Sequence, residues 1–390
     1  MGDLAVVHVV DSLAGSGGAE NRLVDEVVAL AERGGVDQTV VRLYERDDLQ
    51  PRLAAAEVPV VALGFRGGAA GRAWPLAARR LRAVLQERRP AVVHTALFSG
   101  NLVGQLAARP LGLPVVSSFN RTGDLALQRA LQPGVDSWRG RTMQAVARWS
   151  AGRGDVHFRA VSAYARDTNC RLLGIPPERA TVVPRGITVD PAVVAGADRA
   201  AFGLADGVPL VVNVARLVPE KAQHLLVEAF ASARVDLPGA QLAIAGAPGS
   251  AEGAVRDAIA RHDVGDAVHL LGDRPDARAL VAVADVFAFS SVSEGSPGAV
   301  LEALALGAPV AAFAIPPVAE LTDGGRHARL APEGDVPALA AAIVAAAGTP
   351  DREAEVAAAR AWAAGFDLPA VADRLAELLA TRAAAGVPAR

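Results

Sequence analysis

The chain has 390 residues, of which 52% are hydrophobic and 4% are aromatic, and its formal net charge is −3. Such a charge gives no reason to expect nucleic acid as a partner, and so few aromatic residues leave little surface for stacking bases. The single cysteine, Cys170, excludes an internal disulfide bond and fits a reducing compartment. At roughly 100–200 residues per domain, the length predicts two domains.

The start of the chain does not predict a targeting segment. Asp3, His8 and Asp11 interrupt its apolar residues, which argues against a secretory signal. The most apolar stretch, residues 303–318, contains one glycine and three prolines, so it is too short and too broken to span a bilayer. We therefore expect a soluble, cytoplasmic protein.

Short apolar runs alternate with helical patterns through the first half of the chain. In residues 19–33, Leu23, Val27 and Leu30 share one helical face, and Gly34 follows as a natural stop. Strands are expected at residues 4–10, 38–43, 58–63, 91–94, 114–118, 160–162 and 181–183. Continuous apolar strands between amphipathic helices are typical of a parallel sheet with helices on both faces.

The segment 72–90 predicts a basic helix with an apolar face. That face is formed by Ala77, Leu81, Val84 and Leu85. We favour a normal sheet-covering helix with solvated arginines. A weak peripheral contact between these arginines and anionic lipid is the alternative.

The strand pattern restarts at residue 208, with strands expected at residues 208–214, 241–245, 268–271, 286–289 and 309–313. Residues 186–207 lack a strong strand and are predicted to be a linker. The expected α/β fold is therefore two doubly wound, Rossmann-like domains facing across a cleft. They comprise residues 1–188 and 189–367, and a final helix (core 370–382) within residues 368–390 crosses back to the first domain. In open parallel sheets ligands bind outside the carboxyl ends of the strands.

The segment 293–303, SEGSPGAVLEA, predicts a loop followed by a helix. Ser296 is a favourable N-cap, Pro297 suits the first helical position, and the helix should end at Leu306 before Gly307. The start of the helix predicts an anion-binding site, formed by the free N–H groups of Gly298, Ala299 and Val300.

Two glutamates flank this helix start. Glu294 precedes the helix, and Glu302 lies in its second turn among apolar residues, where a carboxylate without a partner is costly. An ordinary loop charge and an ordinary helix charge are the simple alternatives. A carboxylate on each side of a phosphate site suits a nucleotide-sugar, because one can accept hydrogen bonds from the sugar and the other from the ribose.

Lys221 is the only lysine among 39 basic residues. It follows an apolar strand, together with Arg216, in NVARLVPEK. A compact ammonium and a planar guanidinium are not interchangeable at a tight phosphate site. We therefore take this lysine as a candidate for phosphate binding rather than as a chance surface residue.

These motifs together resemble the family-4 retaining glycosyltransferases, which have the GT-B fold. The resemblance includes the Glu-x7-Glu spacing in EGSPGAVLEALALGAPV and the two cations in NVARLVPEKAQHLLVEAF. It extends to GGAE after the first strand, VVH at residues 92–94, FRAVSAYARD, VVPRGITVD and LLGDRPDARALVAVADVF. The family transfers a sugar from a nucleotide-sugar with retention of anomeric configuration and without a bound metal.

The resemblance assigns roles to individual residues. Arg216 and Lys221 resemble the pair that neutralises the donor diphosphate, a chemical need where no metal compensates the leaving group. Glu294 resembles the residue that holds donor-sugar hydroxyls, and Glu302 resembles the one that holds the ribose. The loop around Leu270, Gly272 and Arg274 resembles the segment that packs against the nucleotide base. Gly17 and Gly18, which have no side chain, would let the backbone come close to the phosphates or the acceptor.

The chain departs from the family at the end of the strand at 114–118, where many members carry a histidine. We place Asn120 at that position, although a shift of one residue would place Phe119 there. Asn120 can donate a hydrogen bond but cannot take a proton at neutral pH. A second frequent histidine is replaced by Ala96, and His94 itself is better explained as a structural residue than as a base.

We therefore expect a hexosyltransferase that uses a UDP- or GDP-sugar as co-substrate, with no further cofactor and no metal. The acceptor could be a glycan, a lipid-linked precursor, a cyclitol or an aglycone, in carbohydrate or secondary-metabolite biosynthesis. The alternatives of the same fold are a nucleotide-sugar 2-epimerase, a pseudo-glycosyltransferase and a non-catalytic binder of sugar nucleotides. Dinucleotide binding is disfavoured because Glu20 stands at the third glycine position of G-x-G-x-x-G.

Overall fold

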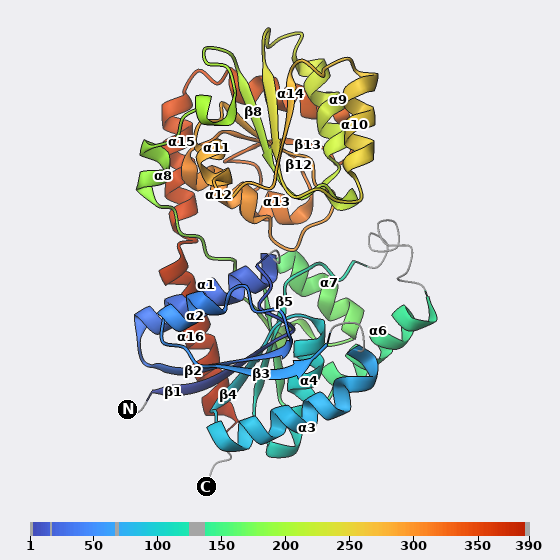
Figure 1. Cartoon of the computed structure of the whole chain (residues 1–390), viewed down its shortest axis with the longest axis vertical. Helices are drawn as coiled ribbons and strands as arrows, with labels where there is room; N and C mark the ends of the chain where they lie inside the picture. Colours follow the sequence, from blue (N-terminus) through green and yellow to red (C-terminus); the bar gives the residue numbers. More distant parts are fainter. Residues whose placement is uncertain (1–2, 16–17, 67–69, 125–136, 387–390) are drawn as a thin grey trace. The chain divides into compact units, whose positions relative to one another are not determined.

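The computed structural model describes residues 3–15, 18–66, 70–124 and 137–386 (Figure 1). The chain divides into two compact units, which are considered separately. The first unit comprises Met1–Gly186 and Asp367–Arg390, and the second comprises Ile187–Phe366.

The described residues of the first unit form a seven-stranded parallel sheet in the order β3-β2-β1-β4-β5-β6-β7. Its strands are β1 (Leu4–Val10), β2 (Val36–Tyr44), β3 (Val60–Phe65), β4 (Val92–Thr95), β5 (Val115–Phe119), β6 (Val156–Ala160) and β7 (Ala180–Val182). Its helices are α1 (Gly18–Arg33), α2 (Gln50–Ala55), α3 (Ala70–Arg88), α4 (Phe98–Ala108), α6 (Trp138–Ala151), α7 (Ala163–Leu173) and α16 (Leu368–Ala385).

The last helix, α16, completes one face of this sheet. Asp367 caps it by accepting a hydrogen bond from the Ala370 N–H at 2.8 Å. Val371, Leu375 and Leu379 of α16 are buried in one apolar cluster with residues of α1, β1, β4 and β5. A second apolar cluster covers the opposite face of this sheet, and it includes residues of helices α3, α4, α6 and α7. The apolar strands are therefore covered on both faces (Figure 1).

The sixth strand differs from its expected position at 160–162, because it occupies Val156–Ala160. Its sequence, VHFRA, hides the strand because polar residues alternate with apolar ones. Arg159 is 1% exposed and bonds to Glu26 of α1 through both terminal nitrogens. A charged residue inside a parallel sheet is tolerated there because a carboxylate from the covering helix neutralises it.

Helix α3 packs as a sheet-covering helix. Leu81 and Leu85 are buried in the cluster under the sheet, and Arg80 donates to the Leu63 carbonyl at 2.9 Å and lies over the Phe65 ring. Contact of this helix with lipid stays a prediction. Among the described residues, none of the helices combines the length and the apolar character that crossing a membrane requires.

The described residues of the second unit form a six-stranded parallel sheet in the order β10-β9-β8-β11-β12-β13. Its strands are β8 (Leu210–Val214), β9 (Gln241–Ala245), β10 (Val268–Gly272), β11 (Val286–Phe289), β12 (Val310–Phe313) and β13 (Arg329–Ala331). Its helices are α8 (Pro191–Ala195), α9 (Gln223–Ala233), α10 (Glu252–Arg261), α11 (Ala277–Ala282), α12 (Gly298–Leu306), α13 (Pro316–Leu321), α14 (Val336–Ala347) and α15 (Arg352–Ala364).

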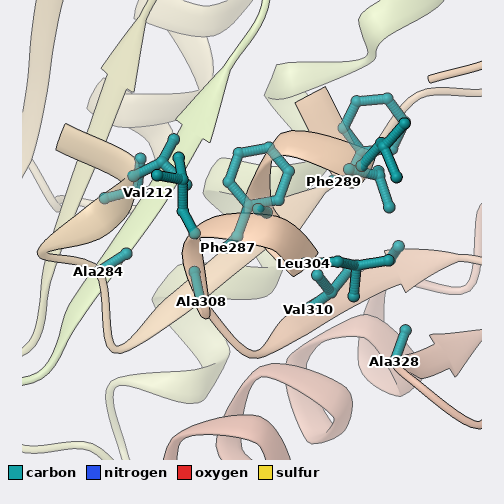
Figure 2. Packing of buried hydrophobic residues seen from close by; sticks show 14 of the residues in the cluster. Val212, Ala284, Phe287, Phe289, Leu304, Ala308, Val310 and Ala328 are labelled. Carbon is teal, nitrogen blue, oxygen red and sulfur yellow. The ribbon is translucent and has the colours of Figure 1, made fainter. Parts of the chain in front are cut away.

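Two apolar clusters cover the two faces of the second sheet. In one of them Phe287, Phe289 and Val310 pack against Leu304 of α12 (Figure 2). The predicted linker at 186–207 is wrong for most of its length, because Phe202 and Leu204 are buried in this same cluster. Strand β13 was not predicted, since a three-residue strand that begins with arginine has no apolar run.

Candidate active site

The second sheet has a topological switch point between β8 and β11. From β8 the chain adds β9 and β10 on one side, and β11 then pairs with the other side of β8. The loops that follow β8 and β11 therefore diverge, and such a point is where open α/β sheets bind ligands. The predicted residues Arg216 and Lys221 follow β8, whereas Glu294 and α12 follow β11.

The loop after β8 is held in a fixed conformation. Gln223 is fully buried, and its side-chain amide donates to the Ala215 carbonyl at 3.3 Å and to the Arg216 carbonyl at 3.0 Å. A short 3₁₀ helix, Pro219–Lys221, follows, and Ala222 adopts a left-handed conformation with φ of 46°. This turn brings Lys221 back over the strand ends.

Lys221 and Glu294 form an ion pair between the two loops. The Lys221 Nζ donates to Glu294 Oε1, and the two side chains are only 18% and 13% exposed. Backbone contacts fix the same arrangement, because the Ser290 hydroxyl donates to the Lys221 carbonyl at 2.9 Å and the Val292 N–H donates to the Glu220 carbonyl at 3.0 Å. Two residues to which the resemblance gives separate roles are thus in direct contact.

The start of α12 differs from its expected form. Pro297 occupies the N-cap position, not the first helical position, and no side chain caps the helix. The Val300 N–H donates to the Pro297 carbonyl at 3.2 Å, so it is not free as predicted. The N–H groups of Gly298 and Ala299 have no partner among the described residues, which leaves two donors at the positive end of a helix dipole.

Arg216 is exposed, and its guanidinium has no partner among the described residues. Glu302, in contrast, is 18% exposed and accepts a hydrogen bond from Arg278 of α11 at 3.1 Å. The sequence pattern shows no partner for the Glu302 carboxylate, but the fold supplies one. This partner, Arg278, comes from the neighbouring helix α11 and lies 24 residues earlier in the chain.

Leu270 and Arg274, the two candidates near the end of β10, lie in different surroundings. Leu270 packs partly against the apolar cluster of α9, so its side chain belongs to the core. Arg274 is bound by Asp276 through two hydrogen bonds of 2.8 and 2.6 Å and lies 5.1 Å from the centre of the Phe202 ring. A base at this edge would meet backbone and the Arg274 side chain.

The remaining candidates belong to the first unit. Asn120 follows β5 directly and is partly exposed, whereas Phe119 is 7% exposed and stacks on Phe158 with ring centres 4.4 Å apart. Asn120 is therefore the first residue after β5, and its assignment to the family's histidine position stays a prediction. Gly18 begins α1, and a Cβ atom there would meet nothing within 4 Å. Gly17 lies outside the described residues.

His94 is a buried structural residue. His94 Nδ1 lies 3.0 Å from His8 Nδ1, its Nε2 lies 3.0 Å from the Ser118 hydroxyl, and the Gln38 side-chain oxygen lies 3.0 Å from His8 Nε2. Burial holds the pKa of His94 well below its usual value and lowers the pKa of His8 to about 4. Burial therefore favours the neutral form of both rings at physiological pH.

The sequence did not reveal the role of Asp11, which follows β1 at the switch point of the first sheet. Its carboxylate accepts hydrogen bonds from the Gly100 N–H at 2.6 Å and the Ser99 N–H at 3.4 Å, at the start of α4. Burial raises the pKa of Asp11 to about 6, against the lowering effect of those hydrogen bonds. An Asp directly after the first strand, with a helix start after the neighbouring strand, is the only signal that could have predicted it.

The described residues contain no group of three or more histidine, cysteine, aspartate or glutamate side chains that could hold a metal ion. The charged groups that follow β8 and β11 include Arg216, Glu220, Lys221 and Glu294. Glu302 of α12 is paired with Arg278 of α11.

Two family models match the chain, one on each side of the unit boundary. Residues 16–191 match the model described as Glycosyltransferase Family 4, and residues 208–348 match the model described as Glycosyl transferases group 1. The chain carries two glycosyltransferase domains. The expected glycosyltransferase family is thereby confirmed at the level of these domains.

Curated relatives match over part of their length. WcaL of Salmonella typhimurium, a glycosyltransferase assigned to colanic acid biosynthesis, is 30% identical over 186 residues, which are 44% of this chain and 43% of WcaL. The amylovoran biosynthesis glycosyltransferase AmsK of Erwinia amylovora is 32% identical over 142 residues, or 34% of this chain and 35% of AmsK. The matched part thus spans less than half of either relative.

Solved structures share the fold over nearly the whole chain. Anabaena HepE, crystallised with UDP and glucose, has a TM-score of 0.78 and 23% identity and covers 96% of this chain and 99% of its own. A sucrose-phosphate synthase of Thermosynechococcus elongatus has a TM-score of 0.79 and 17% identity and covers 98% and 100%. The expected fold of two Rossmann-like domains, as in GT-B glycosyltransferases, is confirmed.

Proposed function

We propose that this chain is a retaining hexosyltransferase that moves a sugar from a UDP- or GDP-sugar to an acceptor hydroxyl. The observation that carries the proposal is the composition of the second switch point. Two helix N–H groups without a partner among the described residues, the exposed cation of Arg216 and the Lys221–Glu294 pair all follow β8 or β11. Such a set suits a diphosphate that is linked to a sugar.

The donor diphosphate is assigned to Arg216, Lys221 and the start of α12. Its leaving oxygen gains negative charge as the glycosidic bond breaks, and cations fixed in advance stabilise that charge without reorganisation. Lys221 is suited to this task because Glu294 and the loop contacts already hold it in place. The ion pair also keeps the site close to neutral before the donor binds.

Glu294 is assigned to the donor sugar. One of its oxygens accepts from Lys221, which leaves the other oxygen for a sugar hydroxyl. Its negative charge also favours the positive charge that develops on the sugar ring in the transition state. Glu302, paired with Arg278, is assigned to the ribose hydroxyls.

The transfer is written as a substitution on one face of the sugar. The bond between C1 and the phosphate oxygen breaks, with its electrons passing to the phosphate, and the acceptor oxygen bonds to C1 on the same face. The acceptor proton passes to the departing phosphate oxygen. Asn120 fits this scheme because it can hold a hydroxyl but cannot act as the base.

The domain assignment and the donor type belong to the same proposal. We assign the donor to residues 189–367 and the acceptor to residues 1–188 with the last helix. The structural neighbour HepE has been crystallised with UDP and with UDP-glucose, which favours a UDP-linked donor for this chain. The acceptor stays open among glycan, lipid-linked precursor, cyclitol and aglycone.

The deciding experiment measures turnover with a panel of UDP- and GDP-sugars and candidate acceptors. Lys221→Ala and Arg216→Ala should each reduce kcat by about 10²–10³-fold, as is typical for one lost charge-stabilising group. Arg234→Ala is the matched control, because Arg234 of the same unit is paired with the exposed Asp266 and is bonded to no other side chain in the part of the chain that the structure describes. Equal kinetics for Lys221→Ala and Arg234→Ala would overturn the assignment.

Three further measurements address the mechanism. The anomeric proton coupling of the product should show the configuration of the donor, and an inverted product would contradict retention. Turnover should survive exhaustive chelation, since arginine and lysine supply the positive charge. Incubation with the donor alone separates an epimerase, which would convert the sugar without any acceptor.

A further inference from the structure

The side chain of Asn120, directly after β5, is held by an arginine from α1. The Arg22 Nη1 donates to the Asn120 side-chain oxygen at 3.2 Å. Burial lowers the pKa of Arg22 to about 9, which still leaves its guanidinium charged at neutral pH. Arg22 is 6% exposed, so water has little access to this contact. A hydrogen bond from a charged donor is stronger than one between neutral groups.

The guanidinium of Arg22 has little competition for its hydrogen bonds. Glu26 lies one turn later on α1, but both of its oxygens accept from Arg159 at 2.6 Å. Asn120 is the one described residue whose side chain accepts from Arg22. The contact between α1 and the end of β5 is therefore specific to these two side chains.

The chemistry of the two groups decides which way the amide of Asn120 points. A guanidinium carries only donors, whereas the end of an asparagine side chain carries one accepting oxygen and one donating NH₂ group. The oxygen must therefore face Arg22, and the NH₂ group must face away from it. Asn120 is partly exposed, and in the part of the chain that the structure describes no group accepts from its NH₂ group. The end of β5 thus presents a hydrogen-bond donor of fixed direction.

We infer that Arg22 is a positioning residue, which holds Asn120 as a hydrogen-bond donor toward the oxygen of the acceptor hydroxyl. The inference rests on the proposed function, because that function assigns the acceptor to this unit. A hydroxyl whose oxygen accepts from the Asn120 NH₂ group keeps its own proton free. In the proposed transfer that proton passes to the departing phosphate oxygen. The opposite orientation of the amide would accept the same proton and hold it away from the phosphate.

A purely structural role, in which the contact only ties α1 to β5, predicts different results. Asn120→Asp separates the two roles, because a carboxylate oxygen still accepts from Arg22 but the side chain has lost its NH₂ group. If the contact were only a tie, turnover would survive this substitution. A positioning role predicts that turnover falls although the contact with Arg22 is kept.

The test measures turnover of UDP-glucose, or of the sugar nucleotide that the panel selects, by the full-length chain. Asn120→Asp should lower kcat by about 10-fold or more, because the carboxylate competes with the phosphate for the hydroxyl proton. Asn120→Ala and Arg22→Met should each lower kcat by about 3- to 10-fold, the equivalent of one hydrogen bond. The thermal midpoint of Asn120→Asp should be at least that of Asn120→Ala, since only the former keeps the contact.

The double variant shows whether Arg22 acts through Asn120. In the Asn120→Ala background no amide is left to orient, so Arg22→Met should lower kcat by less than about 2-fold further. Equal losses in both backgrounds would overturn the inference, because Arg22 would then act independently of Asn120. A wild-type or higher kcat for Asn120→Asp would overturn it as well.

Arg33→Met is the matched control for the loss of an arginine from α1. Arg33 is 42% exposed and ties the other end of this helix to Asp373 of α16 at 2.5 Å. Its substitution removes a contact between two elements without changing the orientation of Asn120. The kcat of Arg33→Met should therefore equal that of the wild type.

Affinity for UDP separates this inference from the proposed function. Arg22→Met and Asn120→Asp should leave the Kd for UDP unchanged, because the diphosphate is assigned to the second unit. A loss of UDP affinity in parallel with kcat would overturn the inference. Failure of the proposed function looks different, since the wild type would turn over no sugar nucleotide or Lys221→Ala would match the wild type. If Arg22→Met fails to fold, Asn120→Asp still decides, because it keeps the contact.

Discussion

The two sheets share the same doubly wound topology, yet their switch points differ in what they offer to an anion. In the first unit the Asp11 carboxylate accepts the N–H groups of Ser99 and Gly100 and so occupies the start of α4. In the second unit α12 begins at Pro297 with no side-chain cap. One residue thus decides whether a helix start is filled by the chain itself or is open to a ligand.

The second difference concerns charge. Asp11 brings a negative charge to the first switch point, whereas the second has the Lys221–Glu294 pair and the exposed Arg216. This difference in charge supports the proposed assignment of the diphosphate to the second unit rather than to the site beside Asp11.

The largest effect is expected from a substitution at Gly246, because it would disrupt the backbone geometry of the second switch point. A Cβ atom at Gly246 would lie 1.9 Å from the Ala215 carbonyl oxygen and 3.0 Å from the Arg216 nitrogen. Both are backbone atoms, so no side-chain rotation relieves the clash. Gly246→Ala should lower the free energy of unfolding by about 3 kcal/mol, at the upper end for overpacking, and displace the loop that carries Arg216. Urea unfolding and UDP affinity check both effects.

Substitutions at two other glycines, Gly253 and Gly100, serve as comparisons for the loss of stability expected at Gly246. Gly253 lies within α10, and a Cβ atom there would meet nothing within 4 Å, so Gly253→Ala should stabilise by about 0.5–1 kcal/mol. At the first switch point a Cβ atom at Gly100 would lie 3.0 Å from the Val9 oxygen and 3.4 Å from the Asp11 carboxylate. Gly100→Ala should therefore cost less than Gly246→Ala. The reverse order would contradict the close approach at β8.

The second prediction concerns a substitution that makes the start of α12 resemble the start of α4. Pro297→Asp places a carboxylate where α12 has no cap, as Asp11 does for α4. The new carboxylate should accept from the Ala299 N–H and repel a diphosphate. We expect the Kd for UDP to rise about 10- to 100-fold, equivalent to about 1.4–2.8 kcal/mol.

Pro297→Asn is the control for that change, because asparagine caps a helix without adding charge. Isothermal titration with UDP should therefore show a smaller loss for Pro297→Asn than for Pro297→Asp. Both variants should be at least as stable as the wild type, since a favourable N-cap adds about 1 kcal/mol. Unchanged UDP affinity in Pro297→Asp would show that the diphosphate does not bind at α12.

The apolar strands and their order of appearance were predictable from the sequence because parallel strands buried on both faces are continuous apolar runs. Five of the expected strands show how far this extends, since 4–10, 241–245 and 286–289 coincide with β1, β9 and β11, and 38–43 and 268–271 lie within β2 and β10. The rule failed for β6 and β13. There a buried Arg159 and a three-residue length leave no apolar run to detect.

The contacts of the candidate site were not predictable in the same way. Lys221 and Glu294 are 73 residues apart in the chain, and only the pairing of β8 with β11 brings them together. The partner of Glu302 comes from α11, and the partner of Asn120 comes from α1. Motif spacing predicts candidate residues, but their pairing depends on strand order, which no local pattern contains.

The smallest expected effect tests the carboxylate that fills the first switch point. The folded-state pKa of Asp11, about 6, lies above the ordinary value of 3.8. The folded chain then holds this proton more tightly than the unfolded chain, so the stability from Asp11 is fully present below pH 4 and is lost as the pH rises through 6. Asp11→Asn keeps one accepting oxygen, for the Gly100 N–H, but cannot titrate. Relative to the wild type it should gain about 1–2 kcal/mol of unfolding free energy between pH 4 and 6.5, after allowance for partial exposure.

Urea unfolding at several pH values, followed by tryptophan fluorescence, measures that difference, since three of the four tryptophans belong to the first unit. The buried histidines His8 and His94 also destabilise the fold as the pH falls below 6.5, but they do so equally in both proteins and cancel in the comparison. The control is Asp48→Asn, at an exposed carboxylate that accepts from the Gly15 N–H at 3.1 Å. Its unfolding free energy should depend on pH in the same way as that of the wild type. If Asp11→Asn also showed the pH dependence of the wild type, the Asp11 carboxylate would be solvated at the helix start. The first switch point would then be as open to water as the second.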